Sequence, residues 1–187
     1  MPSAPKSVTA SSTACRRMLE LSGIVGDSIV DGPGIRTTVF AQGCPHHCPG
    51  CHNPETWDFG CGTPVPAEAI LEMVADNPLC RGVTFSGGEP FAQAEAFLEL
   101  AKLLKQKKYE VASYTGYTFE QLCNGTPAQR ELLQHLDVLI DGPYVAEKRS
   151  LSLAFRGSSN QRILDVPRSL SLGHPVCITA GRWAGEY

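Results

Sequence analysis

The residues best suited to chemistry in this sequence are three cysteines in one short segment. Cys44, Cys48 and Cys51 lie in GCPHHCPGCHN, with three residues between the first two and two between the last two. Closely spaced thiolates are typical of metal or iron-sulfur binding, because a cysteine sulfur is a soft ligand. The other five cysteines are scattered and form no second group of this kind. We therefore expect one cluster site, with the remaining thiols outside it.

Two kinds of site could use this cysteine loop. A structural zinc ion takes four ligands, here the three cysteines and one of His46, His47 and His52. Such sites usually take their ligands as two separated pairs, and the sequence has no second pair. A four-iron cluster held by three cysteines leaves one iron without a protein ligand, which a substrate could bind. The spacing alone leaves both possibilities open.

Length and composition favour one globular domain. The chain has 187 residues, of which 42% are hydrophobic, enough for one ordinary core. Its net charge of -3 shows no basic excess for binding nucleic acid or an anionic membrane, and we expect neither partner. No apolar run approaches the roughly 20 residues that span a bilayer. We predict a cytoplasmic protein with a single domain over 18–187. Residues 1–17, rich in Ser, Thr, Ala and Pro, are predicted to be a disordered leader, the alternative being sequence upstream of a true start at Met18.

Strand-like and helix-like segments alternate along the chain. Apolar and β-branched runs predict strands, and helical spacing of apolar residues predicts helices between them. Alternation of this kind indicates βαβ units and a parallel sheet. Each predicted strand runs into unusual residues: the cysteine loop, SGGEP, TGY and DGPY. The predicted strands are 36–41, 82–85, 109–114 and 137–140, and the segment after residue 143 is left unassigned.

These four turns are expected to form one site, because ligands of parallel sheets bind at the carboxyl ends of the strands. In SGGEP, Gly87 and Gly88 would let a ligand approach the backbone closely. Glu89 offers a carboxylate to an ammonium group. A glycine pair alone is weak evidence, since it also suits an ordinary strand-to-helix turn.

The cysteine loop after one strand and GGEP after the next together resemble the radical S-adenosylmethionine (SAM) superfamily. The segment from Ser28 to Trp57, SIVDGPGIRTTVFAQGCPHHCPGCHNPETW, is similar to the activases of glycyl radical enzymes. YTGYTFEQL (114–122), DVLIDGPY and FRGSSNQ (155–161) resemble in particular the activators of anaerobic, class III, ribonucleotide reductase. The matching motifs cover most of the chain.

The resemblance implies a fold, two cofactors and their contacts. The fold would be α/β, a short partial (β/α) barrel of the radical SAM type with a mostly parallel sheet. A 4Fe-4S cluster would be held by the three cysteines of the loop, and SAM would bind its open iron. The wider superfamily often has an aromatic residue before the third cysteine, where this chain has Gly50, so backbone contacts to adenine are expected there. The implied SAM contacts are Gly50, Cys51, His52, Gly87, Gly88, Glu89, Thr115 and Gly116.

The resemblance also implies a reaction and partners. A one-electron donor such as a flavodoxin or ferredoxin would reduce the cluster, which would cleave SAM to methionine and a 5'-deoxyadenosyl radical. That radical would take a hydrogen atom from a glycine of a partner enzyme, with anaerobic ribonucleotide reductase favoured over pyruvate formate-lyase. Two alternatives of other classes are a zinc-stabilised binding module and a radical SAM enzyme that acts on a small molecule. His46 and His47 are expected to be exposed to solvent. Trp57 is expected to pack against other residues of the protein.

Overall fold

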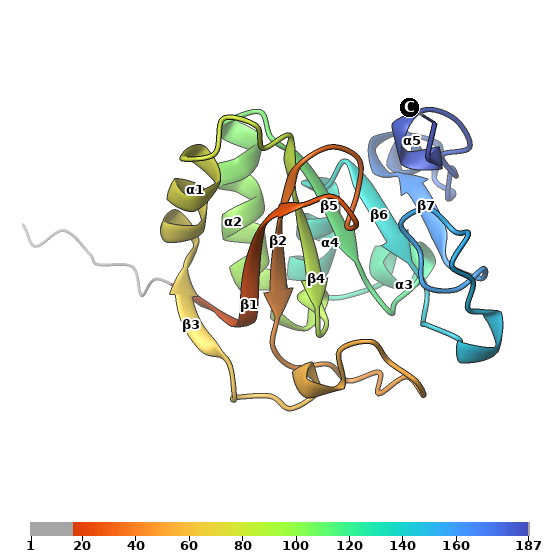
Figure 1. The fold of residues 1–187 in the computed structure, drawn as a ribbon, viewed down its shortest axis with the longest axis horizontal. Coiled ribbons are helices and arrows are strands. Elements are labelled where there is room, and N and C mark those ends of the chain that lie inside the picture. Colours follow the sequence, from red (N-terminus) through yellow and green to blue (C-terminus); the bar gives the residue numbers. More distant parts are fainter. Residues whose placement is uncertain (1–16, 187) are drawn as a thin grey trace, which may run out of the picture.

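The computed structural model describes residues 17–186, so the predicted leader lies outside the described residues except for Arg17. The fold is mixed α/β, built on one seven-stranded sheet (Figure 1). Along the sheet the strands follow the order β3-β1-β2-β4-β5-β6-β7. Their bounds are β1 Met18–Ser28, β2 Arg36–Ala41, β3 Thr63–Pro66, β4 Gly82–Gly87, β5 Glu110–Tyr114, β6 Val138–Asp141 and β7 Arg162–Asp165.

The centre of the sheet is parallel and its two ends are antiparallel. Strands β2, β4, β5 and β6 are the four that the sequence predicts, and they pair in parallel with one another. Strands β1 and β3 extend one end and β7 the other, all by antiparallel pairing. The register places Ala41 opposite Gly87, so the cysteine loop starts beside the glycine pair. The mixed α/β fold with a parallel centre is confirmed. The partial barrel is not confirmed: the described strands form one sheet, whose outer strands are β3 and β7.

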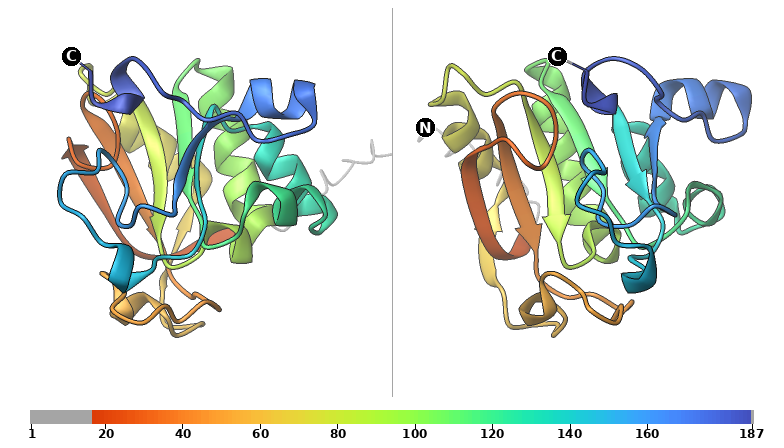
Figure 2. Two further views of the ribbon diagram at one scale, coloured as in Figure 1. Left: turned by 90° about the vertical axis from the view of Figure 1, so that its right-hand side faces the viewer. Right: turned by 45° about the vertical axis from the view of Figure 1, so that its right-hand side comes forward.

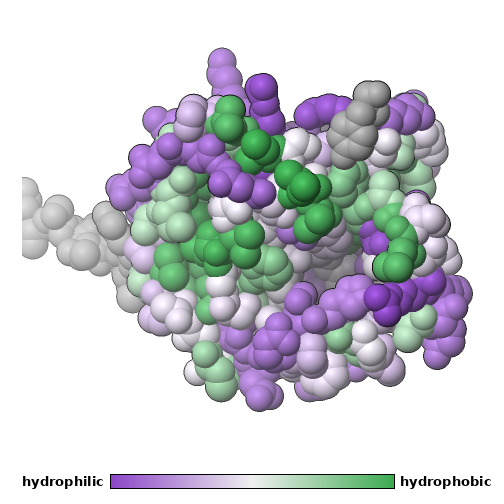
Figure 3. Space-filling model, viewed as in Figure 1, coloured by the Kyte–Doolittle hydropathy of each residue, from purple (hydrophilic) through white to green (hydrophobic). Residues whose placement is uncertain are grey.

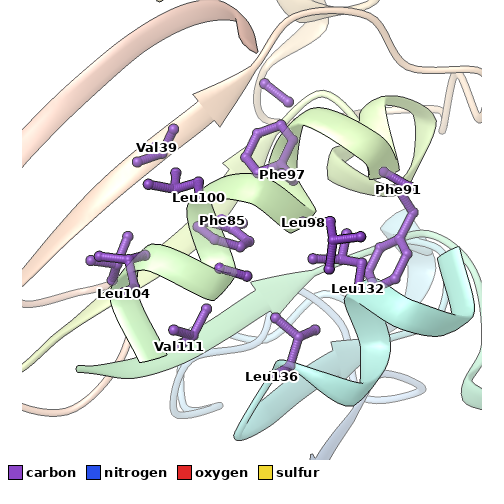
Figure 4. Packing of buried hydrophobic residues seen from close by; sticks show 14 of the residues in the cluster. Val39, Phe85, Phe91, Phe97, Leu98, Leu100, Leu104, Val111, Leu132 and Leu136 are labelled. Carbon is purple, nitrogen blue, oxygen red and sulfur yellow. The ribbon is translucent and has the colours of Figure 1, made fainter. Parts of the chain in front are cut away.

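Helices cover one face of this sheet (Figure 2). Their apolar side chains meet those of the strands in a single large cluster, in which Phe85 of β4 packs edge to face on Phe97 of α2 (Figure 4). Continuous apolar runs in the strands and helical spacing of Phe97, Leu100 and Leu104 explain this face. The helices are α1 Ala67–Ala75, α2 Ala94–Gln106, α3 Phe119–Cys123, α4 Pro127–Gln134 and α5 Val166–Leu172.

The opposite face carries loops instead of helices, including the β1–β2 loop and the segment between β6 and β7 (Figure 2). Under them, at the amino ends of the parallel strands, Arg36 is fully buried. Its guanidinium donates to Glu110 Oε1 at 2.6 Å and to Thr84 Oγ1 at 2.8 Å, and it lies 5.1 Å from the ring centre of Trp183. A buried charge needs such partners. The arginine of DGPGIR therefore lies buried with its partners beneath these loops, at the opposite end of β2 from the cysteine loop.

Candidate functional site

The turns that follow the four parallel strands line one cavity of about 430 Å³, within the roughly 300–1,000 Å³ of small-molecule sites. Figure 3 shows the molecule hollowed on this face, with apolar residues along one side of the hollow. The predicted convergence of the four turns is thus what the structure shows. Lining residues from the predicted turns include Cys44, Cys48, Cys51, Gly87, Gly88, Thr115, Gly116, Gly142 and Tyr144.

The cysteine loop is held by its own backbone. The N–H of Gly43 donates to Thr56 O at 2.8 Å, and the N–H of Cys44 donates to Trp57 O at 3.0 Å. These bonds close residues 43–57 into a loop at the end of β2. Cys44 is buried, whereas Cys48 and Cys51 are half-buried, and burial raises the pKa of the Cys44 thiol. Three thiols are therefore presented from one closed loop to one cavity.

The glycine pair after β4 makes room for the cysteine loop. Gly87 has φ +86°, and a Cβ at Gly88 would lie 2.5 Å from the carbonyl oxygen of Gly43. The N–H of Gly88 donates to Ala41 O at 2.8 Å, and that of Glu89 donates to Gly43 O at 2.9 Å. Both glycines line the cavity, as predicted, but the backbone that approaches them closely belongs to this chain. Their SAM contacts stay a prediction.

Glu89 has no exposed surface, and its carboxylate joins three of the turns. It accepts hydrogen bonds from Phe91 N–H at 3.0 Å, from Thr115 Oγ1 at 2.9 Å and from Gly116 N–H at 2.8 Å. His46 Nε2 lies 2.8 Å from Glu89 Oε2 and donates the fourth bond. The predicted contact of Glu89 with a ligand ammonium group stays a prediction. The structure adds that His46, Thr115 and Gly116 stand between this carboxylate and the cavity.

The two histidines that the sequence leaves to solvent both have protein partners. Besides Glu89, the His46 ring meets the Tyr117 ring edge-on, with ring centres 4.6 Å apart. His47 is exposed but stacks on Trp57, with ring centres 4.9 Å apart. The expectation for His46 was wrong because Glu89, 43 residues away in sequence, needs donors once it is buried. Trp57 packs as expected and also lines the cavity.

The donor set fits an iron-sulfur cluster better than zinc. A closed zinc site gathers four ligands around one ion. Among residues 17–186, no three His, Cys, Asp or Glu side chains are grouped so as to hold a metal ion. A cluster takes one thiolate on each of several irons and does not need the three sulfurs to converge on a point. The three cysteines of the loop are free thiols that line one cavity.

Two buried donors at the cavity wall also have no acceptor. Trp57 Nε1 and Arg156 Nε are buried and make no hydrogen bond among the described residues. Arg156 belongs to the RGSSNQ loop, which Gln161 stabilises by accepting from the N–H groups of Gly157 and Ser158. Unpaired buried donors are uncommon. Both residues line the cavity, but these two nitrogen atoms are themselves enclosed by protein, so a ligand would reach them only if the side chains moved.

Comparison with known proteins decides the family. A family model described as a 4Fe-4S single cluster domain matches residues 30–164. The anaerobic ribonucleoside-triphosphate reductase-activating protein of Vibrio cholerae is 36% identical over 143 residues, which are 72% of this chain and 90% of that protein. This chain belongs to that family of activating proteins. A family member from Pasteurella multocida is 38% identical over 144 residues, with the same shares covered.

Two proteins with other names match this chain over only part of their own length. The pyruvate formate-lyase-activating enzyme of Clostridium pasteurianum is 39% identical over 135 residues, which are 68% of this chain but 54% of that enzyme. A crystal structure of QueE from Escherichia coli matches with a TM-score of 0.39 and 21% identity over 55% of this chain and 51% of that one, too distant to support an argument.

The cofactor prediction, a 4Fe-4S cluster with SAM, is confirmed for the family. Within residues 17–186 no helix has the length and apolar character to cross a membrane.

Sequence reasoning missed several residues of the cavity. Asp31, Tyr144 and Phe155 line it, yet none was named as a contact. Tyr144 carried a usable signal, because it ends the DGPY turn directly after a predicted strand. Phe155 lies in the segment left unassigned, and only the path of the chain after β6 brings it to the cavity.

Proposed function

We propose that this chain is a radical SAM enzyme that installs a glycyl radical on an anaerobic ribonucleotide reductase. The observation that carries the proposal is that Cys44, Cys48 and Cys51 line one cavity with the turns of β4, β5 and β6. When bound, the cluster and SAM supply a one-electron reduction and a 5'-deoxyadenosyl radical able to remove a hydrogen atom from a glycine α-carbon. The protein supplies orientation and a site sheltered from water.

The described residues have distinct parts in this proposal. The three cysteines hold the cluster, and the free iron position is left to SAM. Thr115 and Gly116, whose hydroxyl and N–H groups donate to Glu89, form the wall next to the loop against which SAM would lie. Arg156, whose guanidinium donates to Gln161 O at 3.1 Å, adds a positive charge to the lining of the cavity that would attract a carboxylate. The buried Glu89 acts on SAM through these neighbours.

The extent of the matches favours the reductase over the lyase as the partner. The aligned residues make up 90% of the Vibrio activating protein and 54% of the Clostridium lyase activator, so the similarity extends over more of the former. Pyruvate formate-lyase stays the second candidate, because identity over the shared part is 39%. For the electron donor we propose a flavodoxin or ferredoxin.

The proposal is tested by anaerobic reconstitution with iron and sulfide, reduction, and addition of SAM with each partner. Electron paramagnetic resonance of the mixture should show the doublet of a glycyl radical on anaerobic ribonucleotide reductase. A doublet on pyruvate formate-lyase alone would contradict the choice of partner. Cleavage of SAM without a glycyl radical on either enzyme would contradict the activase function, and a colourless protein containing zinc would favour the binding module.

A further inference from the structure

The ring of Tyr144 is enclosed by two loops that both have glycine at the point of contact. A Cβ at Gly157, in the RGSSNQ loop, would lie 3.0 Å from Tyr144 Cδ2 and 3.3 Å from its Cε2. A Cβ at Gly50, in the cysteine loop, would lie 3.7 Å from Tyr144 Cε1. The 3.0 Å distance is tighter than ordinary van der Waals contact, so a side chain at 157 would displace the ring. Glycine at 157 therefore leaves room for the ring, whereas a Cβ at Gly50 would make ordinary van der Waals contact with it and would lie nearer, at 3.4 Å, to Ala146 Cβ.

This ring belongs to the cavity and not to the core. Tyr144 is half-buried and lines the same cavity as Cys51 and His52. Its ring centre lies 4.9 Å from that of His52, the residue after the third cysteine. No hydrogen bond of the described residues uses its hydroxyl group. Tyr144 therefore presents an aromatic surface next to the thiols without a structural hydrogen bond that would explain it.

Phe40, Trp57, Tyr114 and Phe155 also line the cavity, and the last three are engaged by protein partners. The Trp57 ring stacks on His47 at an interplanar angle of 25°. Phe155 packs edge-on against Trp183, with ring centres 5.5 Å apart. The hydroxyl group of Tyr114 donates to the carbonyl oxygen of Phe155 at 3.0 Å, and burial raises its pKa well above the usual range. Tyr144 also has a ring neighbour, His52, but that contact is tilted by 49° and the two rings do not stack.

We propose that Tyr144 is the aromatic platform for the adenine base of SAM. The proposal rests on the proposed function, which places SAM in this cavity. Gly50 carries no side chain beside the third cysteine, and the Tyr144 ring, delivered from the end of β6, occupies the adjoining space. Stacking suits this role, because a base can lie on a tyrosine ring without any hydrogen bond to the hydroxyl. The DGPY turn and the glycine of RGSSNQ then serve one purpose, which is to bring this ring to the base.

The test compares ligands with and without the base on the anaerobically reconstituted protein. Equilibrium dialysis measures the affinities of SAM, 5'-deoxyadenosine and methionine for the unchanged protein and for Tyr144→Leu and Tyr144→Phe. Base stacking on an aromatic residue is worth enough that Tyr144→Leu should lose about tenfold in affinity for SAM and 5'-deoxyadenosine. Methionine lacks the base, so its affinity should stay the same. Tyr144→Phe keeps the ring and should bind all three ligands as the unchanged protein does.

Iron content after reconstitution checks that the variants fold, and Tyr144→Met replaces Tyr144→Leu if the latter binds no iron. Unchanged binding of 5'-deoxyadenosine by the variant without a ring would overturn the assignment while leaving the proposed function intact. An equal loss for methionine would also overturn it, because Tyr144 would then support the whole cavity and not the base. If the unchanged protein binds no SAM, the proposed function and this inference fail together.

Discussion

Glu89 Oε2 and His46 Nε2 lie 2.8 Å apart, and this contact joins the cysteine loop to the turn after β4. The same carboxylate accepts from the backbone N–H groups of Phe91 and Gly116. A buried carboxylate with this many donors cannot be replaced by a neutral group without leaving some donor unpaired. Glu89 therefore holds together three segments that the chain keeps far apart.

Replacement of Glu89 should destabilise the protein. In Glu89→Gln one acceptor oxygen becomes an NH2 group that faces other donors, and hydrogen bonds to charged groups are worth about 1.5–3 kcal/mol. We expect the free energy of unfolding of the cluster-free protein to fall by about that amount, measured by urea denaturation. Glu99→Gln is the matched control, because Glu99 is exposed on α2. Equal stability of the two variants would show that the Glu89 contacts add nothing.

A side chain at Gly88 should disturb the cysteine loop. A Cβ there would lie 2.5 Å from the carbonyl oxygen of Gly43, so Gly88→Ala must push residue 43 and the adjoining Cys44 away from β4. We expect fewer irons per chain after reconstitution, measured by iron and sulfide analysis. Gly26→Ala is the control, since a Cβ at this exposed glycine of β1 has no atom within 4 Å. Full iron content in Gly88→Ala would show that the loop tolerates the shift.

The three cysteines of the loop should be required for the cluster and the distant ones should not. Cys44→Ala, Cys48→Ala and Cys51→Ala should each abolish the visible absorbance of the reconstituted cluster, because each removes one iron ligand. Cys61 and Cys177 are exposed and do not line the cavity, so Cys61→Ala and Cys177→Ala should keep it. A cluster that survives in the triple variant of the loop would overturn the assignment of its ligands.

Acidification should weaken the contact between α3 and β7. Arg162 binds Asp141 and Glu120, and its hydrogen bonds lower the pKa of Glu120 to about 2. Since the folded pKa lies below the ordinary 4.5, this contribution is present above pH 4.5 and is lost as the pH falls towards 2. Half of the Glu120 side chain is exposed, so the effect should be small and reduced by salt. Thermal unfolding at pH 6 and pH 3 measures it.

The matched variant for this pH effect is Glu120→Gln, because the glutamine amide does not gain a proton as the pH falls. Its unfolding temperature at pH 6 should be slightly lower than that of the unchanged protein. Between pH 4.5 and pH 3 it should fall by less, because one of the groups that bind protons on acidification is missing. An identical pH dependence in both proteins would mean that Glu120 makes no net contribution.

The central strands were predictable because their signals are local. Buried parallel strands read as continuous apolar runs, and β2 begins and ends as predicted at Arg36 and Ala41. The outer strands carried weaker signals. β1 is irregularly paired and half exposed, β3 contains two prolines, and β7 has four residues after an unassigned loop. Such strands are defined by the neighbour they pair with, which the sequence does not name.

By itself the sequence determined the edge of the sheet at which the site lies, and the resemblance of its motifs to a known family indicated the chemistry. The cysteine spacing and the residues that follow each strand can be identified from short stretches of sequence. Because parallel strands present their carboxyl ends on one edge of the sheet, these residues must lie near one another. Tertiary structure alone decided that Glu89 turns inward to His46 and that Tyr144 meets Gly50 and Gly157. His46 and Glu89 are 43 residues apart in the sequence, and Tyr144 meets Gly50 and Gly157 in loops without regular structure. Such contacts depend on which side chains are buried and on the path of the backbone, and no local sequence pattern encodes either.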